Sequence, residues 1–190
     1  MLGILLTKWT IRLALACYVG YLTGLLVNRS PGWSKVGRWL STAGCGLFIV
    51  HVVCAMGFYH DWSHAQAFAT TARETRELLG FEFGAGIYFS YLFLLVWVGD
   101  VLWSWLAPHS FSARPRWLAL GIHLYLVFIA FNGAIVFEAG PTRWAGIVVC
   151  VALVGMLAWR VARNVGRHSV ALPGYRREGC ATESRPTLKT

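Results

Sequence analysis

The sequence predicts an all-α, polytopic integral membrane protein: about five transmembrane helices in a bundle, with one short extracytoplasmic amphipathic helix. Hydrophobic residues make up 57% of the 190-residue chain and charged residues only 13%, whereas a soluble domain carries roughly 25% charged residues. The mean hydropathy is +0.56. Ten Trp, seven Tyr and eleven Phe supply aromatic groups of the kind that collect at membrane interfaces. These observations exclude a water-soluble globular domain.

Apolar segments of the length of a bilayer crossing define a single transmembrane domain over residues 1–165. A span needs about 20 apolar residues. We therefore expect spans at about 9–27, 39–59, 84–106, 117–137 and 144–163. The last apolar run is short, but Arg160 and Arg163 can extend it because their long side chains reach the interface.

Residues 60–83 form a polar connection between the second and third spans. Ser63 followed by Gln66 resembles a capping box, which predicts a helix start. Apolar residues then recur at helical spacing and leave charged residues toward water, which predicts a short helix on the membrane surface. The basic residues 166–190 have little apolar periodicity, so we expect a disordered tail.

The distribution of Lys and Arg predicts the orientation. Twelve of them, seven in residues 160–190, fall on one side of the predicted spans. The positive-inside rule places that side in the cytoplasm. The N-terminus is then outside and the C-terminus inside the cell membrane, which is the inner membrane in a Gram-negative bacterium. The net charge of +9 therefore indicates anionic lipid headgroups at the tail rather than nucleic acid.

Asp100 and His123 are the first candidate site. They lie the same number of residues from the midpoint of the connector between spans three and four, so an antiparallel hairpin places them at one depth. A carboxylate inside a membrane should face the bundle and hold a partner. We expect an intramembrane polar pair that either clamps the hairpin or serves in a small proton-coupled transporter.

His51 and His123, within spans two and four, are candidate axial ligands of haem b, since membrane cytochromes hold haem between histidines of a helical bundle. At 1.5 Å per residue they are offset by about 9 Å along the membrane normal, which is awkward for one haem. A hydrogen bond from each histidine to a neighbouring helix is the alternative.

His60 and His64 have i,i+4 spacing, which places both on one face of a continuous helix and could hold a transition metal such as zinc or iron. Asp61, Glu82 or Glu138 could add a carboxylate ligand. Against this hypothesis, a helix starting at Ser63 requires the chain to turn between the two histidines.

These candidates leave three functional classes. The first is a membrane protein that binds a metal ion or haem, and the second is the proton-coupled transporter. The third is an accessory or assembly subunit of a membrane complex without chemistry of its own. We expect the transporter to require a homo-oligomer, because five spans leave little room for a substrate pathway. Walker, GxSxG and dinucleotide-binding motifs are absent from the sequence, so nucleotide-driven and α/β-hydrolase chemistry have no support. The sequence does not decide whether the protein is an enzyme.

Overall fold

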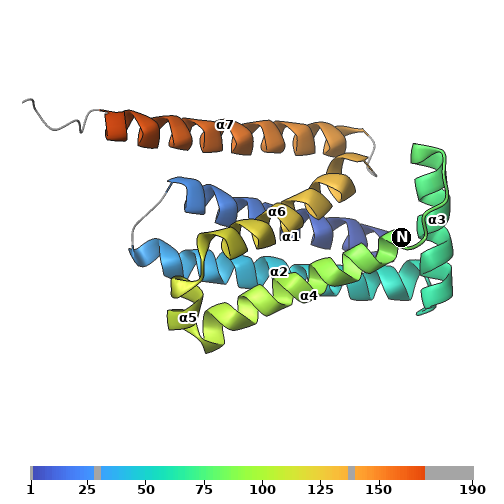
Figure 1. The fold of residues 1–190 in the computed structure, drawn as a ribbon. Coiled ribbons are helices and arrows are strands. Elements are labelled where there is room, and N and C mark those ends of the chain that lie inside the picture. The colour runs from blue at the N-terminus through green and yellow to red at the C-terminus, as the bar shows by residue number, and fades with distance from the viewer. Residues whose placement is uncertain (1, 28–30, 137–139, 170–190) are drawn as a thin grey trace, which may run out of the picture.

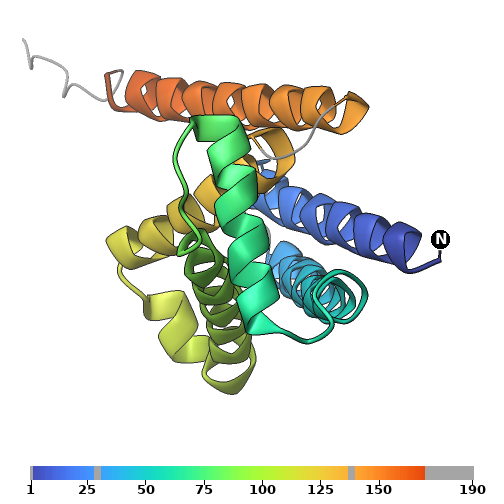
Figure 2. The same ribbon diagram turned by 90° about the vertical axis from the view of Figure 1, so that its right-hand side faces the viewer.

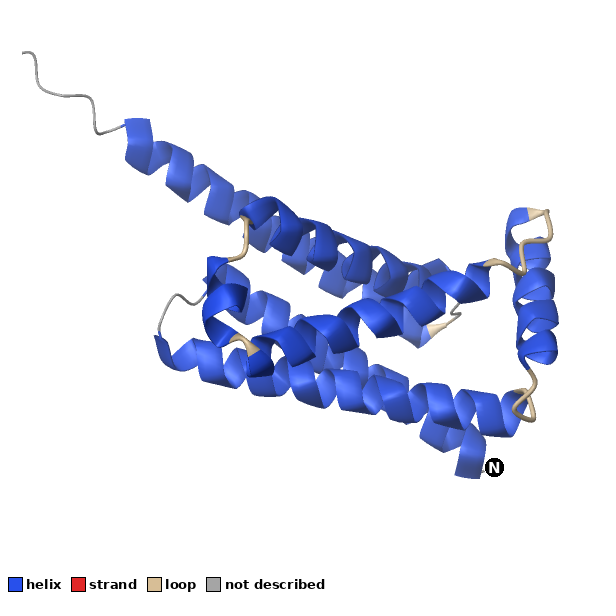
Figure 3. Cartoon of the chain, turned by 60° about the horizontal axis from the view of Figure 1, so that its bottom comes forward, coloured by secondary structure: helices blue, strands red, loops and turns tan. Residues whose placement is uncertain are grey.

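The computed structural model describes residues 2–27, 31–136 and 140–169, which form helices joined by short turns (Figures 1 and 3). The elements in chain order are α1 (Leu2–Val27), α2 (Pro31–Tyr59), α3 (His64–Leu79), α4 (Gly86–Leu106), α5 (Pro108–Ala113), α6 (Arg116–Phe131), a π-helical turn η1 (Asn132–Val136) and α7 (Pro141–Ser169). The described residues contain no strand. The predicted all-α class is therefore confirmed.

Five of these helices are long and apolar enough to cross a membrane: α1, α2, α4, α6 continued by η1, and α7. Each overlaps one predicted span. The helices α1 and α2 begin several residues before the predicted apolar segments, because helical hydrogen bonding continues beyond the apolar core of a bilayer. α7 runs to Ser169, so the start of the predicted tail is helical, and residues 170–190 lie outside the described residues.

The core lies where α1, α2, α4 and α6 meet. Its fully buried side chains include Tyr18, Phe93, Trp97 and Leu126. Gly44 of α2 allows the close approach, because a Cβ there would lie 2.9 Å from the Trp97 ring and 3.1 Å from a backbone oxygen of α1. A glycine in a membrane helix commonly marks such a contact between helices.

Helix α6 changes into the π-helical turn at Asn132. The Asn132 side-chain amide donates to the carbonyl of Phe128 at 2.8 Å, and a side chain bonded to its own helix competes with the regular backbone ladder. Gly133 follows, and glycine weakens a helix further.

Helix α7 lies at the edge of the bundle (Figure 1, top) and packs against α1 and η1. Its Arg160 donates a hydrogen bond to the carbonyl of Leu25, at the end of α1. Near its other end, Arg12 of α1 donates to the Thr142 hydroxyl at 2.8 Å. Two arginines therefore tie α7 to α1, in addition to apolar packing.

Helix α3 lies across one end of the bundle (Figure 2, green). The Ser63 hydroxyl accepts a hydrogen bond from the backbone N–H of Gln66 at 3.3 Å, and Gly80 ends the helix with φ 82°. The helix start that the sequence predicts at Ser63 is present. Ala67 and Thr75 are buried against the bundle, while most charged residues of α3 are exposed, as in an amphipathic surface helix.

Candidate functional site

A buried ion pair joins Asp100 of α4 to Arg114, the residue that follows α5. The two side chains are 4% and 9% exposed. Pro108 starts α5, and Pro115 follows Arg114, whose ψ of 142° is extended, as expected of a residue before proline. The chain therefore reverses at Arg114, whose guanidinium lies 4.0 Å from the Phe111 ring centroid and reaches the Asp100 carboxylate.

His123 of α6 lies close to this pair but bonds to a different helix. Its Nδ1 is 3.2 Å from the Tyr18 hydroxyl of α1. The Tyr21 ring lies 5.6 Å from the imidazole, and Arg114 is within reach of Tyr21. Asp100, Arg114, His123, Tyr18 and Tyr21 thus form one interior group, which we call the inner polar cluster.

The structure thus gives Asp100 and His123 separate hydrogen-bond partners, Arg114 and Tyr18. A direct bond between them is not present in the described part of the chain. From the sequence, Arg114 is expected at the membrane surface, because it lies in the connector between two predicted spans. An arginine just before a proline, with a side chain long enough to reach α4, is the signal that could have revealed it.

The other ring nitrogen of His123, Nε2, is buried, and no described residue bonds to it. Buried polar atoms normally hold a partner. Within the inner polar cluster, this Nε2 is a buried atom to which no described residue bonds.

His51 of α2 contacts α1 near the start of that helix, whereas His123 contacts it at Tyr18. The His51 Nδ1 lies 2.9 Å from the backbone oxygen of Thr7, and because a carbonyl only accepts, Nδ1 carries the proton. His51 and His123 thus contact α1 at residues 7 and 18, which are about 16 Å apart along a helix axis. These contacts with well-separated parts of α1 argue against a haem b that both histidines would ligate.

His60 and His64 do not share one continuous helix. Asp61 and Trp62 have φ of 46° and 59°, in the left-handed region that ends helices, so the chain turns between the two histidines. The His64 Nδ1 lies 3.0 Å from the Tyr91 hydroxyl of α4, and His60 precedes the turn with a buried Nδ1 that no described residue bonds.

The metal hypothesis needs further ligands beside these histidines. Within residues 2–27, 31–136 and 140–169, no three His, Cys, Asp or Glu side chains come close enough to hold a metal ion. Glu138, the proposed carboxylate ligand, lies outside the described residues. Metal binding at His60, His64, Asp61 and Glu138 therefore stays a prediction from sequence.

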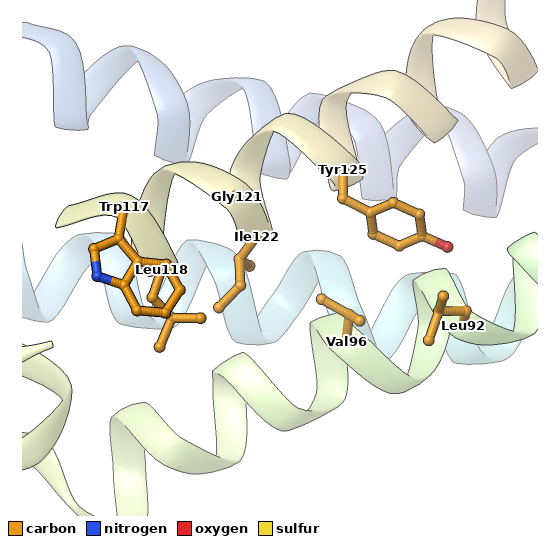
Figure 4. Close-up of a pocket in the computed structure, with 7 residues that line it drawn as sticks. All are labelled: Leu92, Val96, Trp117, Leu118, Gly121, Ile122 and Tyr125. Carbon is orange, nitrogen blue, oxygen red and sulfur yellow. The ribbon is translucent and has the colours of Figure 1, made fainter. Parts of the chain in front are cut away.

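A groove between α4 and α6 is a feature that the sequence did not reveal (Figure 4). Its volume is about 300 Å³. Gly121 leaves it open, since a Cβ there would meet no atom within 4 Å. A glycine within an apolar run was the available signal. The lining residues are Leu92, Val96, Trp117, Leu118, Gly121, Ile122 and Tyr125.

Charge divides between the two ends of the bundle. The starts of α2 and α6 and the ends of α4 and α7 lie at one end, on the left in Figure 1. That end carries Lys35, Arg38, Arg114, Arg116, Arg160 and Arg163, and its one described acidic residue, Asp100, is paired with Arg114. The described acidic residues Asp61, Glu74, Glu77 and Glu82 lie at the other end, around α3, where Arg73 and Arg76 balance part of their charge.

No protein family, no curated protein and no solved structure matches the chain. The function therefore has to be inferred from the arrangement of the chain's own residues. This arrangement defines a helical protein with five candidate membrane spans, the fifth of which has no buried residue in its most apolar window. It also includes one buried ion pair in the described residues and an apolar groove.

Proposed function

We propose that this chain is an accessory subunit of a membrane complex, which contributes a helical bundle and no chemistry of its own. The main support for this proposal is the low burial of α7. None of the residues in its most apolar window is buried against the described chain, whereas 11–28% of that window is buried in each of the other four candidate spans. A span that packs against its own bundle on one face only is suited to pack its other face against a helix of another protein.

One face of α7 contacts the bundle, and the opposite face is exposed and carries small residues. At 100° per residue, Gly146 and Arg160 share the face toward η1 and α1, where both make close contacts. Gly155, Ala158 and Ala162 share the opposite, exposed face. Small residues allow two membrane helices to approach closely, and a Cβ on Gly155 would meet no atom within 4 Å.

The buried polar side chains support a structural role for the rest of the bundle. Asp100 is paired with Arg114, the Trp97 indole N–H donates to the Ser41 hydroxyl at 3.2 Å, and the Ser104 hydroxyl donates to a backbone oxygen at 2.7 Å. Each of these contacts satisfies a polar group inside the bundle, and two of them join different elements. Such contacts stabilise helix packing in lipid.

Native gel electrophoresis of membranes solubilised in a mild detergent tests the proposal. The wild-type chain should migrate in a complex larger than its own 21.1 kDa with bound detergent. Gly155→Leu should release it from that complex, because the added side chain separates the helices. Gly46→Leu, at a second glycine with open space around its Cβ, is the matched control. A monomeric wild type, or a Gly155→Leu variant that stays in the complex, would refute the proposal.

The same proposal includes the orientation. The basic end of the bundle faces the cytoplasm by the positive-inside rule, so α3 lies on the extracytoplasmic side, the inner membrane being the location in a Gram-negative cell. Reporter fusions near residues 70 and 180 should read out in opposite compartments. The same compartment for both would overturn the orientation.

A proton-coupled membrane protein is the second candidate, and it is favoured by the buried Nε2 of His123, to which no residue of the described chain bonds. An imidazole that changes protonation inside a bundle is a component of proton relays. Proteoliposomes carrying the wild type should then dissipate an imposed pH gradient faster than those carrying His123→Phe. Equal rates for the two would exclude this candidate and leave the accessory role.

A further inference from the structure

We propose that the groove between α4 and α6 binds one acyl chain of an anionic phospholipid, whose phosphate lies at the start of α6 beside Arg116. This site is separate from the exposed face of α7, so it stands or falls independently of the accessory role.

The shape of the groove suits a hydrocarbon chain. Figure 4 shows Trp117 at one end and Tyr125 at the other, with Val96 and Leu92 on the facing helix. Gly121 supplies the depth, since it has no side chain to fill the space. The Tyr125 hydroxyl donates to the carbonyl of Phe89 at 2.8 Å, so its one polar atom is satisfied and its ring forms part of the wall.

The lining favours a lipid chain. Apart from Trp117 and Tyr125, the side chains that line the groove are purely hydrocarbon, and Gly121 has none. An acyl chain, which carries no side chains and no polar groups, can lie along it.

The charges at the Trp117 end favour an anionic headgroup. Arg116 precedes Trp117 and is exposed. The start of α6 has no side-chain cap, and the first free N–H groups of a helix favour a phosphate. Lys35 and Arg38 lie at the same end of the bundle, while the Asp100 carboxylate is already paired with Arg114. A phosphate there meets positive charge without a competing free carboxylate among the described residues.

Native mass spectrometry of the delipidated protein tests the site. The protein is mixed with phosphatidylglycerol or phosphatidylcholine in detergent, and bound lipid is counted per chain. The wild type should retain one phosphatidylglycerol in clear preference to phosphatidylcholine. Gly121→Leu should lower that retention at least tenfold, and Arg116→Gln should remove the preference between the two lipids. Gly46→Leu, on the exposed surface of α2, should behave as the wild type.

A second filling variant keeps the test valid if Gly121→Leu does not fold. Val96→Phe fills the same groove from α4 and should also reduce phosphatidylglycerol retention. The proposal is overturned if the wild type shows no preference, or if a folded filling variant keeps the lipid. It is also overturned if filling the groove changes the oligomeric state and leaves lipid retention unchanged, because a second copy would then cover the groove.

Discussion

The buried ion pair makes a prediction that depends on which partner is removed. Asp100 lies six residues before the end of α4, about 9 Å into the span, so it cannot leave the bundle. Arg114 lies in a connector at the end of the bundle and can swing its long side chain outward. Arg114→Leu should therefore destabilise the protein more than Asp100→Leu does.

The magnitudes follow from the burial of both side chains, which are 4% and 9% exposed, so solvent screens the pair weakly. Arg114→Leu leaves an uncompensated carboxylate and should cost about 3–5 kcal/mol. Asp100→Leu leaves a guanidinium that can escape and should cost about 1–3 kcal/mol. The double variant removes both charges. Its free energy of unfolding should be within about 1 kcal/mol of the wild-type value, or higher than it.

Reversible unfolding in mixed micelles, followed by tryptophan fluorescence, measures these free energies. A double-mutant cycle then gives a coupling energy, which should be about 3 kcal/mol or more. Arg163→Leu, at an exposed arginine of the same end of the bundle, should change the free energy of unfolding by less than about 0.5 kcal/mol. Equal costs for the two single variants, or a double variant that costs their sum, would refute the reasoning.

Three smaller changes test the packing and the cap with the same unfolding assay and with hydrogen exchange. Gly44→Ala pushes a methyl group to within 2.9 Å of the Trp97 ring and should cost about 1–3 kcal/mol, whereas Gly46→Ala, in open space, should cost nothing measurable. Ser63→Ala removes the cap of α3 and should cost about 0.5–2 kcal/mol, seen as faster amide exchange in α3 alone. Tyr18→Phe removes the bond to the imidazole of α6 and should cost about 1 kcal/mol or less. A larger loss with Gly46→Ala than with Gly44→Ala would contradict the packing.

The sequence by itself determined the class of the protein and its local features. An apolar run of about 20 residues must form a helix in lipid, because the backbone has no other partner for its hydrogen bonds. The number of long apolar helices and their approximate ends could therefore be predicted. The start of α3 at Ser63 could also be predicted, since a cap involves residues three positions apart. The same cap correctly indicated that the chain turns between His60 and His64.

Only the tertiary structure decided which side chains meet across helices. Depth matching placed Asp100 level with His123, but the fold of the connector brings Arg114 to that carboxylate instead. Nothing local in the sequence indicates that Gly44 faces Trp97, that α7 is left at the edge of the bundle, or that Gly121 opens a groove. Hydropathy measures how apolar a helix is, and therefore whether it is buried in lipid or protein rather than exposed to water. It does not report which face meets which neighbour, because that choice depends on contacts between residues far apart in the chain.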